Sequence, residues 1–263
     1  GGYRLGHDRI FDHMMLDGLE DAYEAGRSMG TFGEDCAAKY SFTREQQDAF
    51  ATASVQRAKA ATESGAFAAE IVPVTVKDRS GERVVSVDEG PGKVKLEKIA
   101  TLKPAFKKDG TITAASSSSI NDGAAALVMM RESTAKKLGA KPLARIVSHA
   151  THAQEPEWFA TAPLGATQKA LAKAGWQVGD VQLWEINEAF AVVPMALMKE
   201  LDLPHDKVNV NGGACALGHP IGASGARIMV TLIHALKARG LTKGLATLCI
   251  GGGEATAVAL ELV

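Results

Sequence analysis

The feature that most constrains the fold is the alternation of short apolar runs with helical patterns over residues 120–263. The strand-like runs cover 124–130, 143–147, 181–186, 245–250 and 257–263, and the helical patterns cover 167–174, 188–200 and 223–239. Such alternation predicts an α/β fold in which helices cover both faces of a mixed, mostly parallel sheet. The last two runs are joined only by three glycines, so we expect that pair to be antiparallel.

Residues 1–119 are more polar and predict an irregular α+β domain, which divides the chain into 1–119 and 120–263. Apolar residues at helical spacing predict a helix over 11–25. A capping box of Thr43 and Gln46 predicts the start of a second helix, which Gly65 ends. The runs 71–76 and 83–87 predict two strands joined by a turn at 79–81. Further on, Ser133 can cap a short helix that Gly139 closes.

Composition excludes several classes of function. A net charge of −1 gives no global attraction to nucleic acid or to an anionic membrane surface. No apolar run reaches the length of about 18 residues that suggests a membrane span, and the first residues lack a signal-peptide pattern. The three cysteines are an odd number without CxxC spacing, which favours a reducing, cytoplasmic location. The chain opens with Gly1 rather than methionine, so we expect its gene to begin further upstream.

The first candidate site motif is Asn187-Glu188-Ala189-Phe190, directly after a predicted strand. An amide at the carboxyl edge of a sheet can hold a water or polarise a carbonyl group. The alternative is that Asn187 only caps the following helix.

The second motif is the glycine-rich segment 211–225, which ends where a helix begins. Its glycines allow close approach to a ligand, and the free N–H groups of the helix face the segment. It is neither a Walker A loop nor a GxGxxG fingerprint. His219 is the candidate general base or oxyanion donor, although a lone histidine is more often structural.

The third motif is Cys249 followed by the glycines 251–253. Backbone N–H groups beside a thiol can stabilise an enolate or oxyanion, whereas most buried cysteines are inert. Cys215, His219 and Cys249 could also be imagined as zinc ligands. Their spacing is unusual for a structural zinc site and no fourth ligand is evident, so we expect no metal.

Two softer features precede these motifs. Six lysines lie within 93–108, either as a solvated surface or as a site for the phosphates of a nucleotide-like ligand. The four serines at 116–119 suit a narrow ligand channel or a linker.

Together these segments resemble the thiolase family over essentially the whole chain. The resemblance rests on 187–190, on the sixteen residues 212–227 and on 248–253, in the same order and spacing as three family signatures. It implies two similar layered α/β halves with a loop domain inserted in the first. Residues 1–119 then correspond to part of the coenzyme A-binding loop domain and 120–263 to the C-terminal domain.

The resemblance also implies residue roles. His219 corresponds to the histidine that activates a nucleophilic cysteine and lines an oxyanion hole, and Cys249 to the second cysteine, which moves a proton at the α-carbon. Asn187 corresponds to the asparagine that fixes a water in an oxyanion hole, and Gly251 to a backbone donor beside Cys249. The residues that correspond to coenzyme A contacts are Ser118, Met29, Phe106, Phe190 and Ala189.

The activity implied is acyl transfer in fatty acid metabolism, by Claisen condensation of acetyl-CoA or thiolysis of a 3-ketoacyl-CoA. The resemblance implies that coenzyme A thioesters are the substrates. We expect no bound cofactor, and we expect a homotetramer or homodimer. Nothing in the chain matches the family's nucleophilic cysteine, because Cys36 lies in a helical, acid-rich setting that does not suit a low thiol pKa. The chain is therefore expected to be a fragment or to need a separate N-terminal half. The alternatives are a coenzyme A-binding or lipid-carrier relative and an inactive scaffold subunit.

Overall fold

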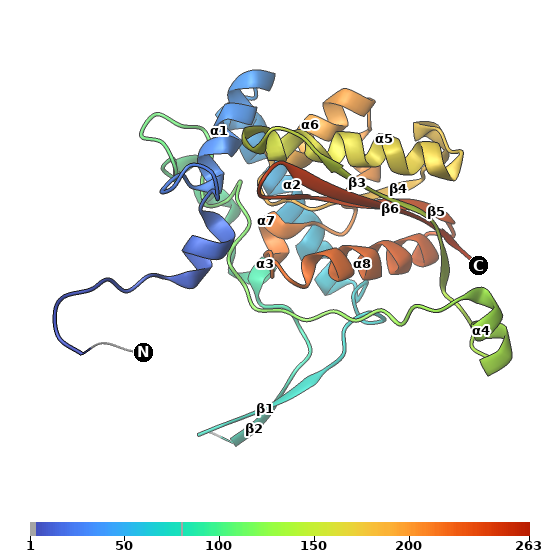
Figure 1. The fold of residues 1–263 in the computed structure, drawn as a ribbon. Helices are drawn as coiled ribbons and strands as arrows, with labels where there is room; N and C mark the ends of the chain where they lie inside the picture. Colours follow the sequence, from blue (N-terminus) through green and yellow to red (C-terminus); the bar gives the residue numbers. More distant parts are fainter. Residues whose placement is uncertain (1–3, 80) are drawn as a thin grey trace.

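The centre of the computed structural model, which describes residues 4–79 and 81–263, is a four-stranded sheet of order β3-β6-β5-β4 (Figure 1). Its strands are β3 (Ala144–Ala153), β4 (Leu183–Ile186), β5 (Lys243–Ile250) and β6 (Glu254–Leu262). β4 and β5 are parallel, whereas β5 with β6 and β6 with β3 are antiparallel. The expected mixed α/β sheet is confirmed, and so is the antiparallel final pair.

The expectation that most pairings would be parallel is wrong for this sheet. β6 returns directly alongside β5 through the glycine turn, and β3 then adds to the free edge of β6 in the antiparallel sense. Only the β4–β5 pair is joined through a helical crossover, which a parallel pair requires.

Helices cover both faces of the sheet, as expected for a layered fold. Figure 1 shows α5 (Ala162–Ala174) and α6 (Val192–Leu201) on one side and α8 (Ser224–Ala238) on the other. β4 shows why. Trp184 and Ile186 join the apolar cluster beneath α5 and α6, whereas Leu183 joins the cluster beneath α8. Successive side chains of a strand point to opposite faces, so β4, whose four side chains are all buried, is covered on both sides.

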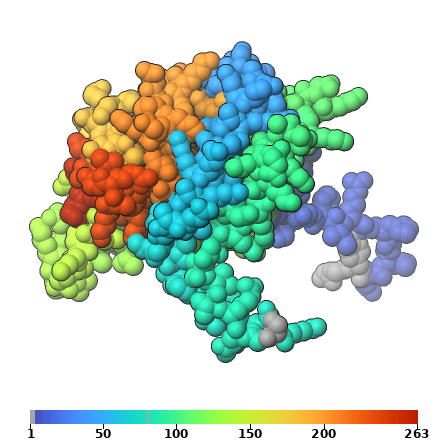
Figure 2. Space-filling view, turned by 180° about the vertical axis from the view of Figure 1, so that it is seen from behind, coloured from blue at the N-terminus to red at the C-terminus, as the bar shows by residue number. Residues whose placement is uncertain are grey.

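The first part of the chain packs against this layered body and also extends away from it. Its elements are η1 (Met15–Leu19), α1 (Met29–Tyr40), α2 (Arg44–Glu63), β1 (Val74–Asp78), β2 (Gly81–Val85), α3 (Gly90–Lys93) and η2 (Leu96–Thr101). Phe32 of α1 lies in the main core cluster. The β1–β2 hairpin projects from the body with its side chains mostly exposed (Figures 1 and 2).

Short elements complete the chain and test the predicted boundaries. They are α4 (Glu132–Leu138), η3 (Pro156–Thr161), η4 (Val178–Asp180), η5 (His205–Lys207) and α7 (Ala214–Leu217). The capping box that begins α2 and the hairpin are confirmed, although Ser80 of the expected turn lies outside the described residues. Gly139 ends α4 with a left-handed φ of 64°, but Ser133 is not its cap, because the helix begins one residue earlier.

Two predicted elements are wrong. Instead of a helix over 11–25, the chain forms only a short helical turn that includes η1, and Phe11 is exposed. The run 124–130 is not a strand of the sheet, and Val128 is 87% exposed. Apolar spacing predicts a regular element only where a second surface buries it, and the apolar side chains of both segments stay exposed or half-buried. Leu127 packs against the cluster beneath α8, but it is not fully buried there.

The described helices include none that is both long enough and apolar enough to cross a membrane.

The capping box gives a stability prediction. Thr43 Oγ1 accepts the Gln46 N–H, and the Gln46 side chain accepts the Thr43 N–H. Thr43→Ala should lower the free energy of unfolding by about 1 kcal/mol, as measured by urea denaturation, because it removes the side-chain acceptor of the Gln46 N–H. Thr43→Ser keeps the hydroxyl and should remain near the wild-type value. Equal losses in the two variants would contradict this role.

Candidate active site

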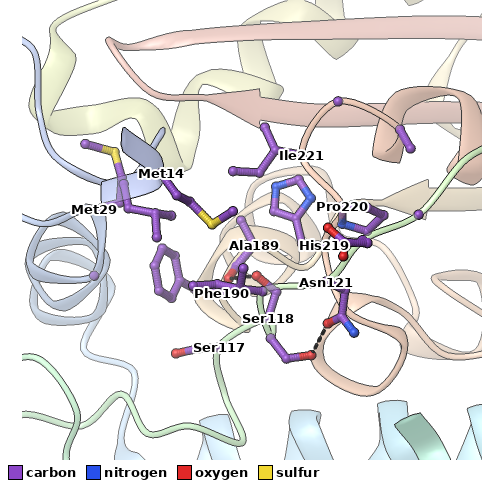
Figure 3. Close-up of a pocket in the computed structure, with 18 of the residues that line it drawn as sticks. Met14, Met29, Ser117, Ser118, Asn121, Ala189, Phe190, His219, Pro220 and Ile221 are labelled. Carbon is purple, nitrogen blue, oxygen red and sulfur yellow. Dashed lines mark hydrogen bonds between the residues drawn. The ribbon is translucent and has the colours of Figure 1, made fainter. Parts of the chain in front are cut away.

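A pocket of about 720 Å³ lies where the first part of the chain meets the layered domain. Six of the sequence-predicted residues line it: Met29, Phe106, Ser118, Ala189, Phe190 and His219. Figure 3 shows His219, Ala189, Phe190 and Ser118 grouped around one space with Met14 and Met29. Met14 was not predicted, because its segment was expected to form a regular helix. The pocket thus collects residues from six separate stretches of sequence.

His219 is held at the pocket from both sides of its ring. Its backbone N–H donates to Ser119 O at 3.0 Å. Nδ1 lies 2.5 Å from Ser224 Oγ, and Nε2 lies 3.4 Å from Asn187 Nδ2. Burial lowers the pKa of His219 from 6.5 to about 4, and the charge of Arg227 adds to this effect. The imidazole is therefore neutral at neutral pH and able to accept a proton.

Asn187 lies at the carboxyl end of β4, as predicted. Its backbone N–H donates to Thr247 O at 3.0 Å, which continues the pairing of β4 with β5. The alternative that it caps a helix is wrong, because α6 begins at Val192 with Ala191 as its cap. The Asn187 side chain is fully buried, and its Oδ1 has no protein partner. A buried amide oxygen needs a hydrogen-bond donor, so this atom is a natural place for a bound water.

Cys249 and Gly251 lie at the end of β5 rather than in the pocket wall. Cys249 is 6% exposed, and burial raises the pKa of its thiol to about 12. Gly251 is the first residue of the β5–β6 turn, and a Cβ added to it would lie 3.3 Å from Met29 Sδ. Met29 itself lines the pocket, so its side chain lies between the pocket and the β5–β6 turn.

The aromatic wall depends on one close approach. The rings of Phe106 and Phe190 meet edge to face with their centroids 5.7 Å apart. Gly30, in the first turn of α1, lies so close to the Phe106 ring that no side chain would fit there. A glycine at this position is therefore required for the pocket to have this shape.

The serine run is joined to the 187–190 motif rather than free. Ser118 donates both its backbone N–H and its hydroxyl to Ala189 O, each at 3.0 Å. Ser117 forms an isolated bridge with Phe190. These contacts favour the channel interpretation of the four serines over the linker interpretation.

The principal residue that sequence reasoning missed is Glu188. Its carboxylate is fully buried and accepts hydrogen bonds from Ser54 Oγ at 2.7 Å, Asn209 Nδ2 at 2.8 Å and Cys215 N at 3.0 Å. Gly213 lies directly against this carboxylate and leaves no room for a Cβ. The available signal was an acid that follows a mostly apolar strand, since a buried carboxylate must be surrounded by donors.

Asn209 completes the attachment of the glycine-rich segment. Its backbone has a left-handed φ of 48°. Its side chain accepts from Ile186 N and donates to Ile186 O, each at 2.8 Å. The amide thus replaces a neighbouring strand at the free edge of β4, immediately before Asn187.

The other thiols and the lysines have different settings. Burial raises the pKa of Cys36 to about 12, so it is not an activated nucleophile, in agreement with the sequence interpretation. No group of three or more His, Cys, Asp or Glu residues with the geometry of a metal site occurs within 4–79 and 81–263. The six lysines of 93–108 are all exposed, and their role with phosphates stays a prediction.

Residues 1–133 match the family model of the thiolase N-terminal domain, and residues 140–262 match that of the thiolase C-terminal domain. An acetyl-CoA acetyltransferase of Chromobacterium violaceum is 53% identical over 262 residues, which are 99% of this chain and 67% of that protein. The chain belongs to the thiolase family.

Solved structures give the same result for the fold. The acetyl-CoA acetyltransferase of Bacillus anthracis matches with a TM-score of 0.95 and 48% identity, over 100% of this chain and 66% of the other. The Acat5 thiolase of Ascaris suum in complex with coenzyme A matches with a TM-score of 0.89 and 41% identity, over 100% and 67%. The chain thus spans about two thirds of the length of these relatives. The domain division at 119–120 and the roles of individual site residues stay predictions.

The lowered pKa of His219 predicts how stability changes with pH. Between pH 6.5 and about 4 the unfolded chain binds a proton on this imidazole that the folded chain does not. The free energy of unfolding should therefore decrease as the pH falls through this window. His219→Gln removes that contribution. Its free energy of unfolding, measured by urea denaturation, should therefore fall less than that of wild type between about pH 7 and about pH 5.

His205, whose pKa burial also lowers to about 4, contributes in the same direction but is present in both proteins and cancels from the comparison. Equal losses of stability in wild type and His219→Gln would contradict a neutral His219.

Proposed function

We propose that the protein containing these residues is an acetyl-CoA acetyltransferase, which joins two acetyl groups carried on coenzyme A or cleaves a 3-ketoacyl-CoA by thiolysis. The observation that carries the proposal is the pairing of a neutral His219 with the buried amide of Asn187 beside the pocket. A neutral imidazole can take a thiol proton, and the amide can orient a water toward a thioester oxygen. The names of the relatives support the same activity.

The first half-reaction needs a nucleophilic cysteine that these residues do not supply. Its thiol would lose a proton to His219, and the thiolate would attack the thioester carbonyl of the first acyl-CoA. The carbon–sulfur bond to coenzyme A then breaks, and the departing thiolate takes a proton. The acyl group remains on the cysteine as a new thioester. Asn187, through a water on its unpaired Oδ1, would stabilise the oxyanion together with His219.

The second half-reaction would use Cys249. Its thiolate form removes a proton from the α-carbon of a second acetyl-CoA, and the backbone N–H of Gly251 lies nearby to stabilise the enolate. The α-carbon attacks the acyl-cysteine, a carbon–carbon bond forms, and the carbon–sulfur bond to the nucleophilic cysteine breaks. That cysteine leaves as a thiolate and takes up the proton that Cys249 gained from the α-carbon, which returns Cys249 to its thiolate form. The raised pKa of Cys249 makes its thiolate a strong base and favours return of the proton in the reverse direction.

Finer features belong to the same proposal. The substrates are coenzyme A thioesters, bound along Met29, Phe106, Ser118, Ala189 and Phe190, and no bound cofactor takes part. The active protein is a homotetramer or homodimer in which the remaining part of the family fold supplies the nucleophile. Three free, buried cysteines support a reducing, cytoplasmic location.

A matched pair of cysteine variants tests the role of Cys249. Cys249→Ala should lower kcat for acetoacetyl-CoA thiolysis by about 10²–10⁴-fold, because it removes the group that transfers a proton at the α-carbon. Cys215→Ala is the control, since Cys215 is equally a buried thiol but lies beside Glu188. The assay is performed on the full-length enzyme that contains these residues. Comparable kcat values for the two variants would refute the assignment.

A second test addresses the dependence on a nucleophile from outside these residues. The 263-residue chain alone should not cleave acetoacetyl-CoA, whereas the full-length enzyme should. His219→Ala in the full-length enzyme should abolish acyl transfer while the circular dichroism spectrum stays native. Thiolysis by the isolated chain, or near-normal turnover of His219→Ala, would contradict the mechanism.

A further inference from the structure

Ser224 is the residue that contacts the ring of His219 on the side away from Asn187. It is the first residue of α8 and is 1% exposed. Its Oγ lies 2.5 Å from His219 Nδ1 and 3.1 Å from Pro220 O. Ser224 does not line the pocket, so any effect it has on a bound substrate must pass through His219.

The hydrogen-bond partners of the ring decide which nitrogen carries the proton. A serine hydroxyl has one proton and two lone pairs. If that proton goes to Pro220 O, the hydroxyl oxygen can only accept from His219, and Nδ1 must then be the protonated nitrogen. The opposite nitrogen, Nε2, faces the side-chain amide of Asn187, whose Nδ2 can only donate.

Both partners therefore favour the same tautomer. An Nε2–H would place two donors against each other across 3.4 Å, whereas an Nε2 lone pair accepts from Asn187. We propose that Ser224 is a positioning residue of the acyl-transfer site, whose hydroxyl accepts Nδ1–H of His219 and so keeps Nε2 unprotonated as the proton acceptor. The catalytic role of Ser224 rests on the proposed function, whereas the tautomer of His219 can be measured whether or not the protein transfers acyl groups.

The surroundings of Ser224 support a neutral ring, for which the tautomer matters. Ser224 begins α8, so the positive end of the helix dipole lies beside His219. Arg227, one turn further along α8, adds a positive charge that lowers the pKa of His219. Both disfavour the imidazolium ion, in which both nitrogens would be protonated and no base would remain.

A merely structural role for Ser224 makes a different prediction. The hydrogen bond from Ser224 Oγ to Pro220 O joins the start of α8 to the preceding loop. If this were the only role of Ser224, removing its hydroxyl would not change the tautomer of His219. Thr231, two turns along α8, is a matched control, because its buried hydroxyl donates to Glu70 Oε1 and touches no histidine.

The experiment measures the ring-nitrogen shifts of His219 in the 263-residue chain, labelled with 15N-histidine, at neutral pH. His219→Gln identifies its signals among those of the seven histidines. Wild type should show a protonated Nδ1 and an unprotonated Nε2. Ser224→Ala should reduce the ratio of this tautomer to the other by about tenfold, the effect of one lost hydrogen bond. Thr231→Val should leave the ratio unchanged, and Ser224→Thr, which keeps a hydroxyl, should restore it at least in part.

The outcomes separate the two proposals. Protonated Nε2 in wild type, or a ratio in Ser224→Ala equal to that of wild type, overturns the role of Ser224. In the full-length enzyme Ser224→Ala should lower kcat for thiolysis by about tenfold with little change in KM, because the substrate contacts remain. If the tautomer shifts as expected but the wild-type full-length enzyme transfers no acyl group, the proposed function fails and the positioning of His219 stands.

Discussion

The arrangement of the site depends on one buried carboxylate, that of Glu188. A charge out of contact with water is tolerated only when donors surround it, and these donors come from α2, from Asn209 and from the backbone of the glycine-rich segment. The same residue is the immediate neighbour of Asn187. One carboxylate thus ties the first part of the chain, the end of β4 and the segment that carries His219 to a common point.

Much of the layered domain could be predicted because its signals are local. The glycine turn between β5 and β6, the capping box of α2 and the helix stop at Gly139 each depend on a few adjacent residues. The segments 11–25 and 124–130 could not be, because their apolar residues specify burial without specifying what buries them. The direction in which the strands pair could not be predicted either, since β3 pairs with β6 across about a hundred residues of sequence.

The site shows the same division between local and distant information. The motifs at 187–190, 211–225 and 249–253 named the residues with chemistry, and the structure brings Asn187 to His219 across 32 positions. Ser224 and Glu188 lay inside or beside these motifs but were not singled out. Glu188 matters because of partners distant in the chain, and Ser224 because of its position against the ring of His219. Neither can be inferred from the residue type alone. Cys249 stands apart from the pocket wall, behind a contact made by Met29.

The glycines at 212 and 213 do not line the pocket, yet their positions have a further consequence. Gly212 lies against the backbone of α2 at Ser54, with a left-handed φ of 82°, and Gly213 lies against the carboxylate of Glu188. Even alanine at either position would force the segment away from both surfaces. A survey of tolerated substitutions should therefore find these two positions as intolerant as His219 itself. In such a survey, the residues that hold the surfaces together would be indistinguishable from those that carry out the reaction.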